Sequence, residues 1–160
     1  MRNVIYKTAT LPASGEELFG MYLDSSTHAA FTGMPAQIGK ENGSSFTAFD
    51  GMLNGTMLHI AHSRLIVQSW RSVAFKDEDP DSTLIISFTS KGNAGHIDLV
   101  HLDVPDHDMD GVTKGWDERY FAPWRSYLQN RKVARSFDVE HRDTGYPTIT
   151  LKDGRRPNDS

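Results

Sequence analysis

The sequence predicts an α+β domain in which a curved antiparallel sheet of about six to seven strands wraps around a long helix. Segments rich in β-branched and aromatic residues recur, and connections of three to five residues make neighbouring segments antiparallel. The stretch Gly115 to Leu128 (GWDERYFAPWRSYL) places Trp116, Tyr120, Trp124 and Leu128 at every fourth position, so one side of a helix is aromatic. A sheet with one apolar face needs such a cover.

The N-terminal part predicts a strand followed by two short helices. Residues 3–10 are β-branched and aromatic, and Pro12 ends the strand. Ser14 and Glu17 form a capping box at the start of a first helix. Asp24 can cap a second short helix, which ends near residue 34.

Side-chain alternation predicts which face of each later strand is buried. The expected strands are 45–49, 55–61, 65–73, 82–90 and 96–104, and the last two are joined by residues 91–95. One face carries Ile66, Gln68 and Trp70; Leu84, Ile86 and Phe88; and Ile97, Leu99 and His101. The loop 76–81 (KDEDPD) is expected to be a solvated acidic turn.

The long helix is expected over residues 112–132, with a kink about one turn before Pro123 because proline lacks a backbone donor. Residues 1–132 therefore form one domain. Residues 133–160 form a C-terminal extension that is expected to be partly ordered or docked as a strand near residues 146–151.

Composition excludes several functions. The net charge of −4 argues against nucleic-acid binding, and the absence of cysteine excludes disulfides and thiolate chemistry. No apolar run reaches the roughly 20 residues that span a bilayer, and the N-terminus does not resemble a signal peptide. A cytoplasmic protein without membrane association is the expectation. No phosphate-binding glycine loop, nucleophile motif or other cofactor signature is present, so no cofactor and no catalytic residue are assigned.

The order of elements is the helix-grip arrangement, and several motifs resemble the START-like (SRPBCC, birch-pollen-allergen) superfamily, in the branch named after activators of the heat-shock-protein-90 ATPase. The matching positions are Pro12 with 16–23, Phe46-x-x-Phe49-Asp-Gly51, Gly55, Arg64 to Val67 running to Trp70-Arg71, 82–84, His101-x-x-Val-Pro105, Gly115-Trp116 and Pro123-Trp124-x-x-Tyr-Leu128. The resemblance covers residues 1–132. Phe31 stands where the family usually has tryptophan, and Gly95-His96 replaces its usual glycine-threonine.

The resemblance implies a cavity between sheet and helix. Relatives bind lipids, hormones or polyketides there, and a few act as cyclases or hydrolases. We therefore expect binding of a small, largely apolar, lipid- or polyketide-like molecule, without demonstrated catalysis. Two alternatives stay open: a cavity enzyme using His101 or His59 with Tyr120, and an interaction or homodimerisation module in which residues 147–151 pair with a partner's sheet edge.

The expected cavity lining combines apolar side chains with a few polar ones. It comprises Phe31, Phe49, Met57, His59, Gln68, Trp70, Phe88, Leu99, His101, Trp116, Tyr120 and Trp124. At least half of the helix aromatics are expected to be ordinary core. For His101, a hydrogen-bonded core histidine is the simpler interpretation.

Residues 106–111 (DHDMDG) match the start of a calcium loop, with Asp117 at its twelfth position. The match is poor, because Lys114 occupies the ninth position and a strand, not a helix, precedes the motif. An acidic loop that caps the following helix at Asp110 is the preferred interpretation, and no metal site is assigned.

Overall fold

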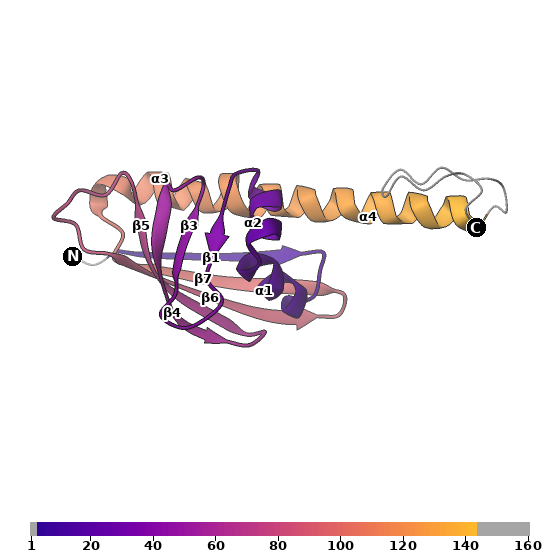
Figure 1. Cartoon of the computed structure of the whole chain (residues 1–160), viewed down its shortest axis with the longest axis horizontal. Helices are drawn as coiled ribbons and strands as arrows, with labels where there is room; N and C mark the ends of the chain where they lie inside the picture. The colour runs from indigo at the N-terminus through magenta and orange to yellow at the C-terminus, as the bar shows by residue number, and fades with distance from the viewer. Residues whose placement is uncertain (1–2, 144–160) are drawn as a thin grey trace. The chain divides into compact units, whose positions relative to one another are not determined.

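A strongly curved antiparallel sheet dominates the computed structural model, which describes residues 3–143, with side chains described up to residue 132 (Figure 1). Within this part of the chain the sheet has seven strands in the order β1-β7-β6-β5-β4-β3-β2. Their bounds are β1 (Val4–Leu11), β2 (Gln37–Ile38), β3 (Ser45–Ala48), β4 (Leu53–Ala61), β5 (Leu65–Ser72), β6 (Ser82–Lys91) and β7 (Ala94–Leu102). The predicted α+β class and antiparallel pairing are confirmed.

Two short helices follow β1, as the capping residues predict. In α1 (Gly15–Leu23) the Ser14 hydroxyl accepts the Glu17 amide at 3.0 Å. In α2 (Ser25–Thr32) the Asp24 carboxylate accepts the Thr27 amide at 2.9 Å. The helix α1 packs on β6 and β7.

Glycine permits this close packing of α1. A Cβ added at Gly95 would lie 2.5 Å from the Ala13 carbonyl oxygen and 2.5 Å from the Leu18 side chain. A larger residue at Gly95 would therefore push the start of α1 off the sheet.

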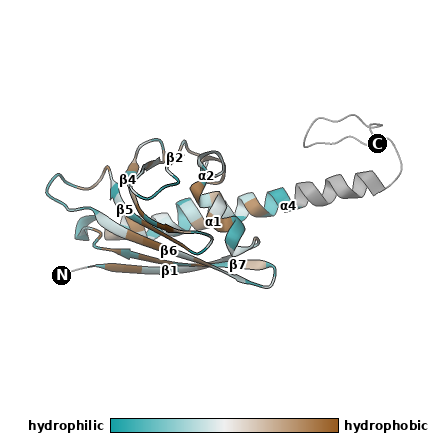
Figure 2. Ribbon diagram, turned by 60° about the horizontal axis from the view of Figure 1, so that its bottom comes forward, coloured by the Kyte–Doolittle hydropathy of each residue, from teal (hydrophilic) through white to brown (hydrophobic). Residues whose placement is uncertain are grey.

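The buried face of the sheet is the one that the alternation predicts. Leu84, Ile86 and Phe88 in β6 and Ile97, Leu99 and His101 in β7 are all buried. The same face of β5 buries Ile66, Gln68 and Trp70. Apolar residues recur along the strands in Figure 2.

Two details of the strands differ from the expectation. The turn between β6 and β7 is shorter than 91–95, because Lys91 pairs with Ala94 and Gly92 takes φ 60°. A left-handed glycine at the first central position suits a two-residue hairpin turn. In β4, the register shifts between Met57 and His59, which marks a β-bulge.

The predicted long helix is built from several pieces. A 3-10 turn, η1 (Asp106–Asp108), leads into α3 (Met109–Gly115), then a π-helical segment, η2 (Trp116–Phe121), then α4 (Ala122–Asp143). The interruption lies in the turn before Pro123, where the missing amide donor predicts it. The helix continues beyond residue 132 to Asp143.

The chain divides into two compact units, Met1–Arg125 and Ser126–Ser160. The first holds the sheet, α1, α2, α3, η2 and the start of α4, and is the helix-grip domain. The second holds the rest of α4; the expected strand at residues 146–151 lies outside the described residues. No helix in the described part of the chain is both long and apolar enough to cross a membrane.

Candidate functional site

A cavity of about 400 Å³ opens between the helical segment and one end of the curved sheet, within the first unit. The turn after β3, the end of β5, α3 and η2 all contribute to its wall. Its lining comprises Phe49, Met52, Leu53, Trp70, Ser72, Val73, Ala74, Asp108, Gly111, Val112, Lys114, Gly115, Trp116, Glu118, Arg119 and Tyr120.

Four of the twelve predicted lining residues meet at this cavity: Phe49, Trp70, Trp116 and Tyr120. Their rings form a continuous aromatic wall. Ring centroids lie 5.3 Å apart for Phe49 and Tyr120, 4.7 Å for Trp116 and Tyr120, and 6.2 Å for Trp70 and Trp116. Phe49 has a left-handed backbone, φ 52°, a conformation that a bulky residue seldom adopts and that clusters at functional sites.

Five other predicted lining residues are buried but belong to the core instead. Phe31 stacks on Trp124 with centroids 4.2 Å apart, and Phe88 packs edge-on against Phe19. Met57 and Leu99 are fully buried. These residues share the inner face of the fold, but none lines the cavity.

Gln68 also faces the core, where its amide is used. Its Oε1 accepts the Tyr22 hydroxyl at 2.7 Å, and its Nε2 donates to the Met57 sulfur at 3.3 Å. This arrangement explains how a fully buried amide is tolerated.

His59 is exposed and takes no part in the cavity. The bulge in β4 is the reason. Met57 pairs with Gln68, whereas His59 pairs with Val67, which lies on the opposite face. One inserted residue therefore reverses the side-chain parity on which the expectation rested.

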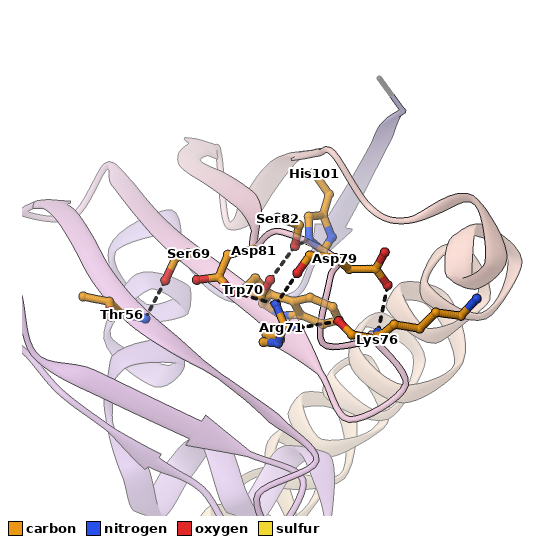
Figure 3. Close-up of polar contacts among 9 residues, drawn as sticks. All are labelled: Thr56, Ser69, Trp70, Arg71, Lys76, Asp79, Asp81, Ser82 and His101. Atoms are coloured by element: carbon orange, nitrogen blue, oxygen red, sulfur yellow. Dashed lines mark hydrogen bonds and ion pairs between the residues drawn. The ribbon is translucent and has the colours of Figure 1, made fainter. Parts of the chain in front are cut away.

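His101 is fully buried and hydrogen-bonded on both ring nitrogens. Figure 3 shows its contact with Ser82. The Trp116 indole, which can only donate, points its Nε1–H at His101 Nδ1, 3.1 Å away. Nε2 therefore carries the proton and donates to the Ser82 hydroxyl at 2.8 Å, which donates in turn to the Trp70 carbonyl at 2.6 Å. Burial lowers the pKa of His101 to about 3, so the ring is neutral.

A second buried histidine, His28, holds another wall residue. Its Nδ1 donates to the Tyr22 carbonyl at 2.8 Å, which leaves Nε2 to accept the Tyr120 hydroxyl at 2.9 Å. Burial lowers the pKa of His28 to about 4 and raises that of Tyr120. Sequence reasoning missed His28; its position in a capped helix three residues before Phe31 is the one available signal.

The cavity has polar groups along one side. Lys114, Glu118 and Arg119 are exposed, whereas Asp108 is half-buried. Burial raises the pKa of Asp108, whereas the neighbouring His107 and Ser72 act to lower it. Asp108 lies at the N-cap position of α3, yet its side chain makes no capping hydrogen bond.

The residues of the calcium-loop match have other partners. Asp106 accepts the Asn3 amide at 2.6 Å, and Asp117 pairs with Lys7 at 2.6 Å. Asp110 lies inside the first turn of α3 and is not its N-cap. Among the side chains described, no three carboxylates or histidines gather in a way that could hold a metal ion.

The acidic loop 76–81 is more ordered than a solvated turn. The Arg71 guanidinium donates to the carbonyls of Lys76 and Asp79, each at 2.7 Å, and to the Asp81 carboxylate at 3.0 Å (Figure 3). His107 contacts the Asp79 carboxylate at 2.8 Å, which lowers the pKa of Asp79. The loop is thereby fastened to the segment that carries Asp108.

Solved structures of similar fold come from several sources. An HSP90 activator from Plasmodium falciparum aligns with a TM-score of 0.72 and 22% identity, over 79% of this chain and 96% of the other. CalU16 from Micromonospora echinospora aligns with a TM-score of 0.65 and 17% identity, over 84% of this chain and 80% of the other. DynU16, a protein in the dynemicin biosynthetic locus, aligns with a TM-score of 0.66 and 14% identity, over 79% of this chain and 47% of the other. At these identities the likeness extends to the fold alone.

A search of curated proteins returns no match. The sequence model of one family, described as activator of Hsp90 ATPase homolog 1-like protein, matches residues 12–129. This match runs from α1 into the first part of α4 and includes every cavity-lining residue. The chain therefore belongs to the activator of Hsp90 ATPase homolog 1-like family, within the START-like superfamily.

Proposed function

We propose that this protein binds a small, largely apolar molecule in the cavity bounded by β5, α3 and η2. One observation carries the proposal: four aromatic side chains from three separate parts of the chain line one cavity of about 400 Å³. That volume lies within the range of about 300–1,000 Å³ typical of small-molecule sites.

The buried histidines support this proposal because they brace the aromatic wall. His101 fixes the Trp116 indole, and His28 fixes the Tyr120 hydroxyl. Side chains held in one rotamer lose less entropy when a ligand binds. The π-helical segment that carries Trp116 and Tyr120 is a feature found frequently at functional sites.

The same geometry supports acid–base catalysis less well than ligand binding, because the candidate histidine and tyrosine groups are already engaged in hydrogen bonds. Neither nitrogen of His101 has a free lone pair, and the Tyr120 hydroxyl donates to a neutral His28. His59, the remaining candidate, is exposed and does not line the cavity.

A cavity-filling substitution tests the proposal. Gly115 lines the cavity, has ordinary helical angles, and has no atom within 4 Å of an added Cβ. We expect Gly115→Leu to occupy the cavity and weaken ligand binding at least about tenfold while keeping the fold. Its free energy of unfolding should not fall, because glycine within a helix is unfavourable by about 0.5–1 kcal/mol relative to alanine.

Gly20→Leu is the matched control, since Gly20 is an exposed helical glycine of α1 that also has no atom within 4 Å of an added Cβ. Native mass spectrometry of the protein purified from its source would identify a retained ligand. Titration of that ligand, followed by tryptophan fluorescence, would compare the variants. Equal binding by Gly115→Leu and Gly20→Leu would place the ligand elsewhere and overturn the proposal.

A further inference from the structure

We infer that the polar end of the ligand is a protonated amine, which pairs with Asp108 at the polar side of the aromatic cavity. This inference rests on the proposed function, since it specifies the chemistry of a molecule bound at the same site.

The first observation is the position of Asp108. It is the half-buried charged residue of the lining, whereas Lys114, Glu118 and Arg119 are exposed on longer side chains. A short side chain gives the carboxylate a nearly fixed position beside the cavity. A charge in a partly desolvated position interacts more strongly with a bound ion than one surrounded by water.

The second observation is that no ion pair joins Asp108 to a lysine or arginine among the side chains that the structure describes; the neighbouring His107 acts on Asp108 electrostatically. Neighbouring ion pairs use other carboxylates: His107 contacts Asp79, and Arg71 contacts Asp81. The Asp108 side chain has the Ser72 side chain as a neighbour and makes no capping hydrogen bond to α3. Its remaining lone pairs are available to a donor in the cavity.

The third observation is the aromatic wall. Phe49, Trp70, Trp116 and Tyr120 line the same cavity as Asp108. Aromatic rings attract cations through their quadrupoles, and tryptophan does so best. Both the fixed charge and the wall therefore favour a cation over an anion, although Lys114 and Arg119 stand at the exposed rim.

Three probes of matched apolar part test the inference: phenylbutylamine, phenylbutanol and phenylbutyrate. Binding is measured by isothermal titration calorimetry and by tryptophan fluorescence with the whole chain at neutral pH. We expect the amine to bind at least about tenfold more tightly than the alcohol or the carboxylate, the size expected of a charge-assisted hydrogen bond.

Asp108→Asn keeps the shape and removes the charge, so it should weaken amine binding about tenfold and leave alcohol binding within about threefold. Asp110→Asn is the matched control, because Asp110 is an exposed aspartate in the first turn of α3 that does not line the cavity. It should change amine binding less than about threefold. Thermal unfolding of each variant checks that the fold is retained.

The outcomes separate the two proposals. Equal or tighter binding of the alcohol or the carboxylate would overturn the amine inference and leave the cavity function standing. Amine binding that resists Asp108→Asn, or falls equally with Asp110→Asn, would also overturn it. If none of the three probes binds, the cavity function fails, and the amine inference fails with it.

Discussion

Two tryptophans in the helical region show how one hydrogen bond changes the role of a buried side chain. Trp116 and Trp124 are both buried, at 2% and 1% exposure. Trp116 donates its indole N–H to His101, whereas the N–H of Trp124 has no partner among the residues whose side chains the structure describes. Trp124 is held instead by stacking on Phe31. Trp116 therefore contributes both a hydrogen bond and apolar packing, whereas Trp124 contributes mainly apolar packing.

This contrast yields a prediction at the residue scale. Trp116→Phe and Trp124→Phe delete the same atoms, but only the first leaves His101 Nδ1 without its donor. We expect Trp116→Phe to lower the free energy of unfolding by about 1–2 kcal/mol more than Trp124→Phe, because an unsatisfied buried acceptor carries a desolvation penalty. Urea unfolding at pH 7 measures both. Equal losses would mean that the bond to His101 contributes little.

The π-helical segment η2 explains why residues four apart in sequence share one buried side. In an ideal α-helix four residues exceed one turn of 3.6, so the stripe drifts by roughly 40° at each repeat. Between Trp116 and Tyr120 the chain is π-helical, and the wider turn reduces that drift. Pro123, which lies in the first turn of α4, donates no amide to the turn before it.

A deletion tests this role of η2 at the scale of the element. Glu118 is exposed within η2, so Glu118→Ala should change stability by less than about 0.5 kcal/mol. Deleting Glu118 should convert the wide turn to an α-turn that leaves three steps of about 100° between Trp116 and Tyr120, so the two side chains would point about 60° apart. We expect the deletion to cost at least about 2–3 kcal/mol, from lost burial and the lost bond to His101. Comparable urea midpoints for the deletion and for Glu118→Ala would show that the π turn is dispensable.

Local signals predicted the elements well, because they depend on residues close in sequence. The Ser14 and Asp24 caps and the alternation through Leu84 and Leu99 are all in place. The site was less accessible to such reasoning. Tyr120 and His28 are 92 residues apart, so no spacing rule could pair them.

Two further residues show where periodicity was insufficient. His59 was expected inside, but the bulge after Met57 changes its face, and no residue of β4 signals that insertion. Asp108 was considered only as part of a metal-binding motif. Its place beside the cavity follows from the short η1 turn, which the sequence did not predict.

At the scale of the whole molecule, the buried titratable groups predict how stability depends on pH. His28 and His101 have pKa values lowered to about 4 and about 3 by burial, against 6.5 when unfolded. Below pH 6.5 the unfolded chain binds protons that the folded one excludes, so stability falls with pH until the folded pKa values are reached. Burial raises the pKa of Tyr22 and Tyr120, so stability also falls above about pH 10. A plateau should lie between these limits.

The acid side of this profile gives the last prediction. Between pH 7 and pH 5 each buried histidine should reduce the free energy of unfolding by about 2 kcal/mol, since each pH unit below 6.5 is worth about 1.4 kcal/mol per group. The carboxylates Asp24 and Asp79, whose pKa values are lowered, lose their contribution only below about pH 4. The two effects therefore occupy different pH windows.

Urea unfolding at pH 7 and pH 5 separates the histidine contribution. His28→Gln removes one titrating group while keeping a side chain that can donate and accept, so it should roughly halve the loss of stability between the two pH values. Lower stability at both pH values with an unchanged difference would mean that His28 takes up its proton over the same pH range in the folded and the unfolded protein, and is protonated in the fold at pH 5. In that case its Nε2 could not accept the Tyr120 hydroxyl at pH 5, and the aromatic wall of the cavity would lack the bond that fixes Tyr120 at that pH.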